Sequence, residues 1–553
     1  MLSRYQFIWI KSGNPWVWLT AGAVSISLIS VLGLLLLIGW KGLVYFWPAP
    51  LYQWQDEHGQ RLIGQIYQQS YVSLDQLSNQ DRTWPDSVLQ SGQAQRLSIK
   101  VANRDIYPRD FISVLSIDLH HQDTPRDLAV FERTHSGDFF GQPISFESEG
   151  QVYKNSLPKR IAIAIQNADA VREKIDHILQ NELQVVTQQL NKLRIERQLK
   201  QKKGKVAVVN LKTLDQRQDA LESKFTLAES KILALQEQLS SARVLVKDMK
   251  GEIISLPLDS ILDVWYPNAM SWGEKAHHWV KQVGKFLLDN PRESNSEGGV
   301  FPAIFGTVLL VIIMSVVVMP LGVIAAVYLH EYAGNTMLTR LIRISVVNLA
   351  GVPSIVYGVF GLGFFVYTIG NSIDELFYSD TLPTPTFGTP GLLWSAMTLA
   401  ILTLPVVIVA TEEGLARVPN SVRHGSYALG ATKFEMLWRT VLPMVSPAIM
   451  TGLILAVARA AGEVAPLMLV GVVKLASNLP VDGNFPFLHL ERKFMHLGFH
   501  VYDVGFQTPN IEAARPLVFA TSFLLITVVV GLNITAIMIR NNLREKFKIL
   551  GND

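Results

Sequence analysis

Six apolar segments, each long enough to cross a lipid bilayer, dominate this chain. A hydrocarbon core of roughly 30 Å requires about 20 residues of helix. Inside lipid every backbone polar group must find its partner within the protein, so such segments fold as helices. We expect the six helices at residues 17–40, 304–329, 344–368, 392–410, 448–473 and 517–539. The sequence therefore predicts an all-α polytopic membrane protein.

Composition supports an integral membrane protein over a soluble enzyme. The chain is 49% hydrophobic and its mean hydropathy is +0.24, which is high for a soluble protein. A net charge of only +3 gives no reason to expect nucleic acid as a partner. Cysteine is absent, which excludes disulfides and cysteine-based metal sites. The first apolar segment is too long for a signal peptide, so we interpret it as a retained anchor.

Lysine and arginine indicate the orientation, because cytoplasmic flanks are enriched in them. They lie before the first segment, between the second and third, between the fourth and fifth, and after the sixth. These four sites fall on one side of the membrane. The loop between the third and fourth segments carries only acidic charges, as an outside loop should. We expect both termini in the cytoplasm and residues 41–298 outside.

The outside segment divides into three expected parts. Residues 41–156 contain short alternating stretches, such as 97–101 and 111–119, which predict mixed, β-rich structure. Residues 157–250 show 4-3 apolar spacing, which predicts a coiled coil. Between its two arms lie Lys202, Lys203, Gly204 and Lys205, a composition typical of a turn, so we expect an antiparallel hairpin. A parallel coiled coil that dimerises the protein is the alternative. The hairpin is either a structural arm or a recognition element.

Aromatic residues gather before the second apolar segment, within residues 251–298. Trp265, Trp272 and Trp279 favour the headgroup region of a bilayer, so we expect an amphipathic stretch on the outer membrane surface. His277 and His278 are adjacent in sequence and do not share a helix face, which argues against a metal site. The remaining parts are the N-terminus with the first helix, 1–40, a five-helix core, 299–540, and a cytoplasmic tail, 541–553.

Two opposite charges lie inside the fifth apolar segment. Arg459 and Glu463 are four residues apart, and charge at membrane depth usually lines a bundle interior or a water-filled path. A guanidinium offers bidentate donors to an oxyanion, and Glu463 would hold Arg459 when no anion is present. The alternative is an ion pair that only fixes helix packing. We expect this pair to line a path for a charged substrate.

The cytoplasmic loop 411–443 carries a recognisable motif. The chain has no phosphate-binding loop and no protease or hydrolase motif, so any energy for active transport must come from a partner or an ion gradient. Gly430 is followed at fixed spacing by Leu442 and Pro443. This spacing resembles the docking motif of ABC-transporter permeases, although His424, Gly425 and Ser426 stand where that family has Glu-Ala-Ala. The resemblance implies that the loop inserts into a separate ATPase.

Longer phrases resemble the phosphate-specific permeases within that family. They are residues 349–358, Thr411-Glu412-Glu413, residues 427–430 and residues 458–467, whose Ala-Pro-Leu ending is closer to the PstA type than to the PstC type. The likeness covers 298–553 closely and the first helix loosely, but not most of the outside insert. Family members often have an arginine just before Thr-Glu, where this chain has Ala410.

The resemblance implies an ABC importer type I permease fold of six transmembrane helices, here with an extramembrane α+β insert. It implies half of an inorganic phosphate importer in the bacterial inner membrane. The expected partners are a PstC-type permease, a PstB-type ATPase dimer and a PstS-type phosphate-binding protein in the periplasm. No cofactor is expected on this chain, since ATP and Mg²⁺ bind the ATPase.

The residues to which the sequence assigns a role fall into three groups. Arg459, Glu463 and Ser354 are expected in the substrate path, and Glu412 is a candidate gate. ATPase coupling is assigned to Arg423, His424, Tyr427, Gly430, Leu442 and Pro443. The altered triplet, Ala410 and the long insert leave open a permease-like scaffold or signalling subunit without transport. A permease for another oxyanion, such as molybdate or sulfate, is the other alternative.

Overall fold

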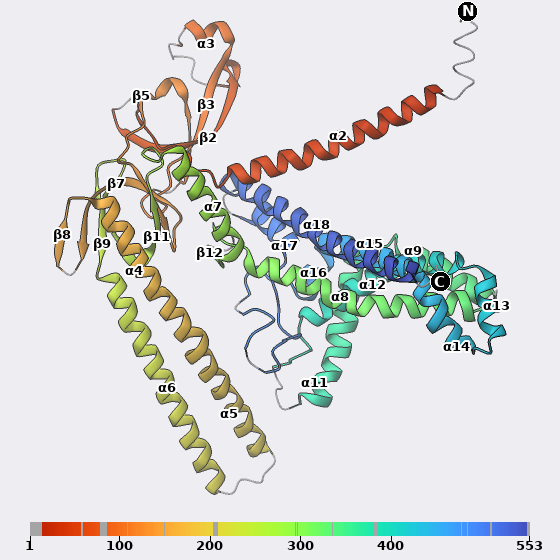
Figure 1. Cartoon of the computed structure of the whole chain (residues 1–553). Coiled ribbons are helices and arrows are strands. Elements are labelled where there is room, and N and C mark those ends of the chain that lie inside the picture. The colour runs from red at the N-terminus through yellow and green to blue at the C-terminus, as the bar shows by residue number, and fades with distance from the viewer. Residues whose placement is uncertain are drawn as a thin grey trace, which may run out of the picture.

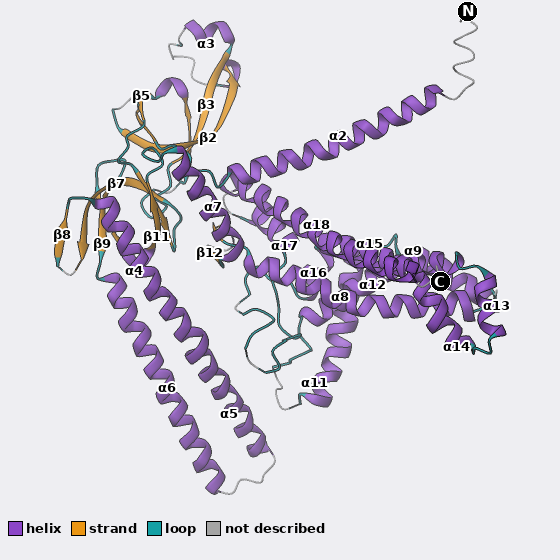
Figure 2. Ribbon diagram, in the orientation of Figure 1, coloured by secondary structure: helices purple, strands orange, loops and turns teal. Residues whose placement is uncertain are grey.

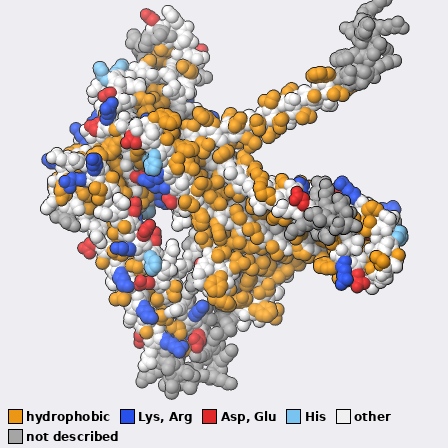
Figure 3. Space-filling view, viewed as in Figure 1, with side chains coloured by type: hydrophobic (Ala, Val, Ile, Leu, Met, Phe, Trp, Pro, Cys, Tyr) orange, Lys and Arg blue, Asp and Glu red, His pale blue; other side chains and the backbone are white. Residues whose placement is uncertain are grey.

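The computed structural model describes residues 14–549, apart from 57–58, 78–83, 85, 108, 149, 203–207, 293–294, 296, 335, 380–383, 477, 484 and 509–510. In these residues six helical segments are long and apolar enough to cross a membrane, as the sequence predicts. The membrane-spanning helices run from the centre to the right of Figure 1, and the insert lies on the left. In Figure 3, apolar side chains cover the middle of the molecule, and charged ones gather at its two ends.

The six spans are built from the following elements: α2 (Asn14–Val44); α8 (Phe301–Val327) with η6 (Tyr328–Tyr332); α10 (Ser354–Phe360), η7 (Gly361–Gly370) and α11 (Asn371–Phe377); α12 (Leu392–Ala416); α14 (Lys433–Met436), η8 (Leu437–Val441) and α15 (Leu442–Gly462); and α18 (Ile511–Ile549). Helices α8, α12, α15 and α18 pack together around buried residues such as Leu310, Leu399 and Ala460. Helix α2 contacts α18, where Gly42 lies against Ala520.

The limits of the spans differ from those expected, and in two spans a proline marks the change. The third begins at Ser354 rather than at residue 344, and residues Met337–Leu349 form a separate helix, α9. Pro353 explains the difference, because proline provides no backbone N–H and disfavours the helical conformation of the residue before it. The fifth span ends at Gly462 rather than at residue 473. A new short helix, α16 (Ala465–Val470), starts after an extended Glu463 and has Pro466 in its first turn, a preferred place for proline.

The described residues of the insert contain two larger antiparallel sheets (Figure 2) and a short two-stranded pair that is given below. The first has the order β4-β3-β2-β1-β5 and includes β1 (Tyr52–Gln55), β2 (Arg61–Ser73), β3 (Gln93–Lys100), β4 (Phe111–Leu115) and β5 (His120–Asp123). The second has the order β10-β9-β7-β6-β11 and includes β6 (Ala129–Arg133), β7 (Phe139–Ser148), β9 (Arg243–Lys247), β10 (Ile253–Pro257) and β11 (Ile261–Trp265), with β8 (Gln151–Tyr153) paired to β7. Short helices accompany them: η1 (Leu74–Gln76), α3 (Asp86–Ser91), η2 (Ser116–Asp118) and η4 (Leu258–Ser260).

A long helical hairpin emerges from the second sheet (Figure 1). One arm is formed by α4 (Leu157–His177), η3 (Ile178–Leu183) and α5 (Gln184–Lys202), and the other by α6 (Val208–Ser240). The arms are antiparallel, and Glu182 on one forms an ion pair with Lys231 on the other at 3.1 Å. Most of the predicted basic turn lies outside the described residues. Val246, which the spacing assigned to a helical seam, instead lies buried in β9, because the chain returns to the sheet after Ser240.

A surface helix joins the insert to the membrane core. Helix α7 (Trp272–Leu288) begins at a capping box formed by Ser271 and Glu274. The Trp279 indole donates a hydrogen bond to the carbonyl of Leu43 at the end of α2, and Trp272 remains largely exposed. The amphipathic stretch is therefore shorter than the expected 251–298, because residues 253–265 belong to the sheet. Strands β12 (Pro291–Arg292) and β13 (Glu297–Gly298) then lead into α8.

Candidate functional site

Arg459 and Glu463 lie where α15 ends. The Arg459 Nε atom is 3.4 Å from Glu463 Oε1, and the two side chains are 31% and 22% exposed. Arg459 occupies the last turn of the helix, where unpaired carbonyl groups favour a cation. The Glu463 backbone is extended, with φ −81° and ψ 124°. The pair thus sits at a helix break, partly open to its surroundings, rather than in the middle of a continuous helix.

The third span borders this break. Gly358 on α10 lies so close to Pro466 that an added Cβ would be 2.7 Å from the Pro466 Cα atom. Tyr357 is near enough to Arg459 to interact with it electrostatically, and its hydroxyl donates to the carbonyl of Leu349. Ser354 begins α10 and is half-buried. Its hydroxyl has no hydrogen-bond partner among the described residues, so it is available to an anion.

Ala410 has a packing reason to be small. Gly452 on α15 faces it, and an added Cβ on Gly452 would lie 2.9 Å from the Ala410 Cβ atom. Gly414, one turn further along α12, is similarly close to Ala448. Helices α12 and α15 therefore approach closely along this face. An arginine in place of Ala410 would have to force them apart, since the close-packed interface has no room for a long side chain.

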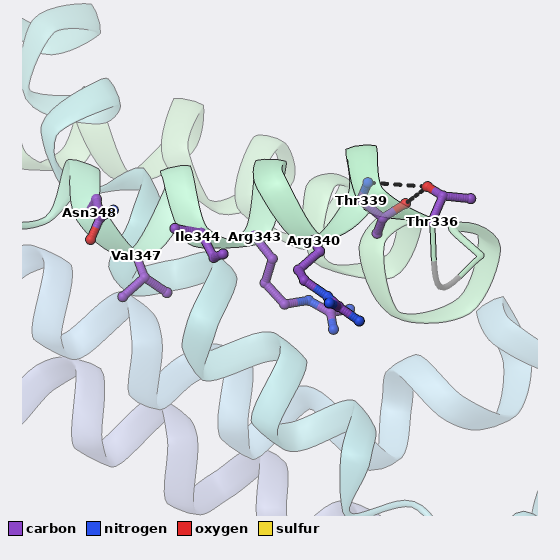
Figure 4. A pocket seen from close by; sticks show the side chains of 7 residues that line it. All are labelled: Thr336, Thr339, Arg340, Arg343, Ile344, Val347 and Asn348. Atoms are coloured by element: carbon purple, nitrogen blue, oxygen red, sulfur yellow. Dashed lines mark hydrogen bonds between the residues drawn. The ribbon is translucent and has the colours of Figure 1, made fainter.

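Glu412, the candidate gate, forms an ion pair with Arg343. In the sequence, this arginine served only to predict the orientation of the chain in the membrane. Arg343 on α9 places its Nε atom 3.5 Å from Glu412 Oε1, and its Nη2 atom donates to the Leu329 carbonyl at 3.1 Å. Arg340 lies one turn before Arg343 on the same helix (Figure 4). The only sequence signal for this arrangement was the spacing of three between the two arginines. Nothing in the sequence indicated contact with α12.

The predicted coupling loop folds as two helices around a glycine. Helix α13 (Asn420–Ala428) has no buried residue, and Gly430 follows it with φ +85°, a conformation that favours glycine. Thr432 and Glu435 then form a capping box that starts α14. Figure 1 shows α13 and α14 at the end of the molecule opposite the insert. The loop therefore presents a compact helix pair on one end of the membrane core.

The six coupling residues have different environments. His424, Tyr427 and Gly430 are exposed, whereas Leu442 and Pro443 are half-buried in the first turn of α15. Arg423 instead points inward and donates to Glu331. The sequence assigned no individual role to the exposed apolar side chains around Gly430, which are Leu429, Phe434 and Trp438. The Phe434 and Trp438 rings stack at 6.2 Å.

Comparisons with known proteins agree with this architecture. Residues 318–544 match the family described as "Binding-protein-dependent transport system inner membrane component". The chain is 35% identical over 245 residues to the phosphate transport system permease protein PstA 1 of Mycobacterium tuberculosis (strain CDC 1551 / Oshkosh), covering 44% of this chain and 71% of that protein. It is 37% identical over 183 residues to PstA of Yersinia pestis, covering 33% of this chain and 56% of the relative.

A more distant likeness extends to a solved structure. An inward-facing methionine ABC transporter, MetNI, matches 44% of this chain and 94% of its own with 18% identity and a TM-score of 0.32. The family assignment rests on the sequence relatives, and the family match itself lies within residues 318–544, in the membrane core. The chain belongs to the family of phosphate transport system permease proteins of the PstA type, among the inner membrane components of binding-protein-dependent transport systems.

Proposed function

We propose that this protein is the membrane-spanning permease subunit of an ATP-driven inorganic phosphate importer. It forms half of the translocation path and couples to a separate ATPase. The observation that carries the proposal is the Arg459–Glu463 pair at the break between α15 and α16, in a chain whose relatives are named phosphate permeases. A guanidinium beside an open helix end suits a phosphate ion, which loses much hydration on entering a membrane protein.

The exchange of partners at Arg459 supplies a mechanism. Without substrate, Glu463 neutralises the guanidinium, which limits the cost of holding a charge at this depth. An arriving phosphate ion replaces the carboxylate with its own oxygens, so the guanidinium keeps an anionic partner throughout. Ser354, at the start of the helix that borders the break, adds a hydroxyl donor. Because Ala410 provides no charge, more of the anion binding falls on Arg459 and on the second permease.

The remaining assignments follow from the same proposal. Both termini and the α13–α14 loop face the cytoplasm of a bacterium, and the insert faces the periplasm. The partners are a PstC-type permease, a PstB-type ATPase dimer that holds ATP and Mg²⁺, and a PstS-type binding protein. The chain itself carries no catalytic site and no cofactor. Exposed apolar side chains around Gly430 support docking to the ATPase.

Uptake of labelled phosphate by cells that express the complete importer tests the proposal. We expect Arg459→Ala to abolish uptake, and Arg540→Ala, which removes an arginine of α18 outside the path, to retain it at matched expression. Unchanged uptake with Arg459→Ala would overturn the path assignment. Competition by unlabelled molybdate or sulfate, stronger than by phosphate, would instead establish a permease for another oxyanion. No uptake by the unmodified importer would favour a scaffold or signalling subunit.

A further inference from the structure

A second cationic site lies beside α9, at the end of the membrane core that also carries α13 and α14. A cavity of about 280 Å³ is lined there by Thr336, Thr339, Arg340, Arg343 and Asn348, together with two apolar side chains. Figure 4 shows the two arginine side chains extending in the same direction from successive turns of the helix. A water molecule occupies about 30 Å³ of liquid, so the cavity has room for a small hydrated ion.

The charges around this cavity do not cancel. Arg343 is held by Glu412 at 3.5 Å and by the Leu329 carbonyl, so its guanidinium is oriented. The Arg340 side chain has no ion-pair or hydrogen-bond partner among the described residues, and no carboxylate lines the cavity itself. The positive charge of Arg340 therefore remains uncompensated. It lies next to the Arg343 guanidinium, which already binds an oxyanion, the Glu412 carboxylate. This arrangement attracts a further anion.

The donors suit a tetrahedral phosphate group better than a single carboxylate. Two guanidiniums three residues apart offer several N–H donors in fixed planes, and arginine is favoured where oxyanions are bound bidentately. The Asn348 amide and the Thr339 hydroxyl also line the cavity, and the Thr339 hydroxyl shares a hydrogen bond with the Thr336 hydroxyl at 2.9 Å. Thr336 already caps the helix by accepting from the Thr339 N–H at 3.2 Å, so the site does not depend on the helix terminus.

Position relates this cavity to the first arginine. Arg459 lies near one end of α15, whereas Glu412 lies near the opposite end of its neighbour α12. Ala410 faces Gly452 and Gly414 faces Ala448, so Glu412 lies level with the middle of α15, roughly 14 Å of helix from Arg459. In both arginine–glutamate pairs the glutamate carboxylate binds the guanidinium when no other anion is present.

We infer that Arg340 and Arg343 form a second, inner site for a phosphate group, with Glu412 as its internal competitor. The group belongs either to inorganic phosphate that leaves the path or to the headgroup of an anionic phospholipid in the adjacent leaflet. The first source rests on the proposed function, and the second does not. In both cases the anion displaces the Glu412 carboxylate from Arg343.

The test uses the purified full-length chain in nanodiscs, with Arg459→Ala introduced to remove the outer site. In discs of phosphatidylcholine alone, binding of labelled inorganic phosphate is measured. In discs that also contain phosphatidylglycerol, the retained phosphatidylglycerol is counted by native mass spectrometry. We expect the double substitution Arg340→Gln with Arg343→Gln to weaken either phosphate binding or phosphatidylglycerol retention at least roughly tenfold. This is the effect of losing one charge-assisted hydrogen bond. Arg540→Gln is the matched control.

The outcomes separate the sources and the hypotheses. Loss of phosphate binding establishes the inner station, and loss of phosphatidylglycerol alone establishes a lipid site. If neither quantity changes in a double variant with an unaltered melting temperature, the inference is wrong. Arg340→Lys, which keeps the charge, guards against misfolding and should retain part of the binding. Phosphate uptake by the unmodified importer is measured separately. If there is no uptake, the proposed function is wrong, but the phosphatidylglycerol measurement still tests whether Arg340 and Arg343 bind a phosphate group.

Discussion

Arg423 of the coupling helix α13 donates a hydrogen bond to the Glu331 carboxylate at the end of the second span, 3.0 Å away. The two side chains are 13% and 10% exposed. Arg423 also donates to the carbonyls of Leu415 and Val418, at the end of α12. One guanidinium thus ties the coupling loop to two membrane helices, and rigid connections of this kind transmit motion between subunits.

Replacement of Arg423 by alanine should uncouple the loop from the membrane core. It leaves the largely buried Glu331 carboxylate with only the His330 ring, 3.4 Å away, which costs on the order of 3 kcal/mol. We expect phosphate-stimulated ATP hydrolysis by the assembled importer to fall while the basal ATPase activity remains. Arg439→Ala, which removes an exposed arginine whose side chain forms no hydrogen bond among the described residues, is the control for stability. Full coupling in Arg423→Ala at unchanged assembly would contradict this role.

Introduction of arginine at Ala410 should destabilise the membrane core instead of improving transport. The Ala410 methyl group faces Gly452 across the close contact of α12 and α15, and overpacking such a contact costs roughly 1–3 kcal/mol. We expect Ala410→Arg to lower the melting temperature of the purified chain. Gly452→Ala should have the same effect by the same contact, whereas Ala410→Ser should have little. A stable Ala410→Arg variant with faster uptake would show that the helices separate readily.

Contacts between residues that are distant in the chain show what the sequence can and cannot predict. Long apolar runs are local, so length alone predicted six spans, and the glycine-to-Leu-Pro spacing located the α13–α14 pair. The Arg343–Glu412 and Arg423–Glu331 pairs join residues 69 and 92 positions apart, which no local pattern specifies. The insertion of the hairpin between β8 and β9 is equally non-local, because strand β7 pairs across it with β9. Pro353 and Pro466, by contrast, are local features of the sequence that indicate where the helices of the third and fifth spans are interrupted.

Acid should destabilise the folded chain through two buried histidines on the connection between α16 and α18. His496 precedes the short helix α17 (Leu497–Tyr502), and His500 lies within it, ahead of η9 (Asp503–Gln507). Burial lowers the pKa of each imidazole to about 4. For His500, nearby Asp503 opposes this shift and Lys474 adds to it. Lys474 and Asp503 form an ion pair at 3.2 Å.

The direction of the change in stability with pH follows from whether the folded or the unfolded chain binds protons more readily. Above the ordinary histidine pKa of about 6.5 both states are neutral and the full stability is present. As pH falls toward 4 the unfolded chain takes up protons that the folded chain refuses, so stability declines by up to about 1.4 kcal/mol per pH unit for each histidine. We expect the melting temperature to fall between pH 7 and pH 5, and to fall less in His500→Leu. His277→Leu, at an exposed position on α7, should leave the pH dependence unchanged, and equal acid sensitivity in His500→Leu would refute the assignment.

The helical hairpin should remain close to the loop that follows α16 in the membrane core. Gln184, at the start of α5, donates a hydrogen bond to Asn478 on the connection that follows α16, at 2.9 Å and 294 residues further along the chain. Because the chain has no cysteine, Gln184→Cys with Asn478→Cys supplies the only two thiols for a short bismaleimide crosslinker. We expect rapid crosslinking within one chain in membranes, detected after a protease cut in the insert. Val152→Cys with Asn478→Cys, which places one thiol on the distant strand β8 (Figure 1), should not react. Equal crosslinking of both pairs would mean that the arm moves freely over the membrane core, whereas selective crosslinking would establish that the arm rests against this loop.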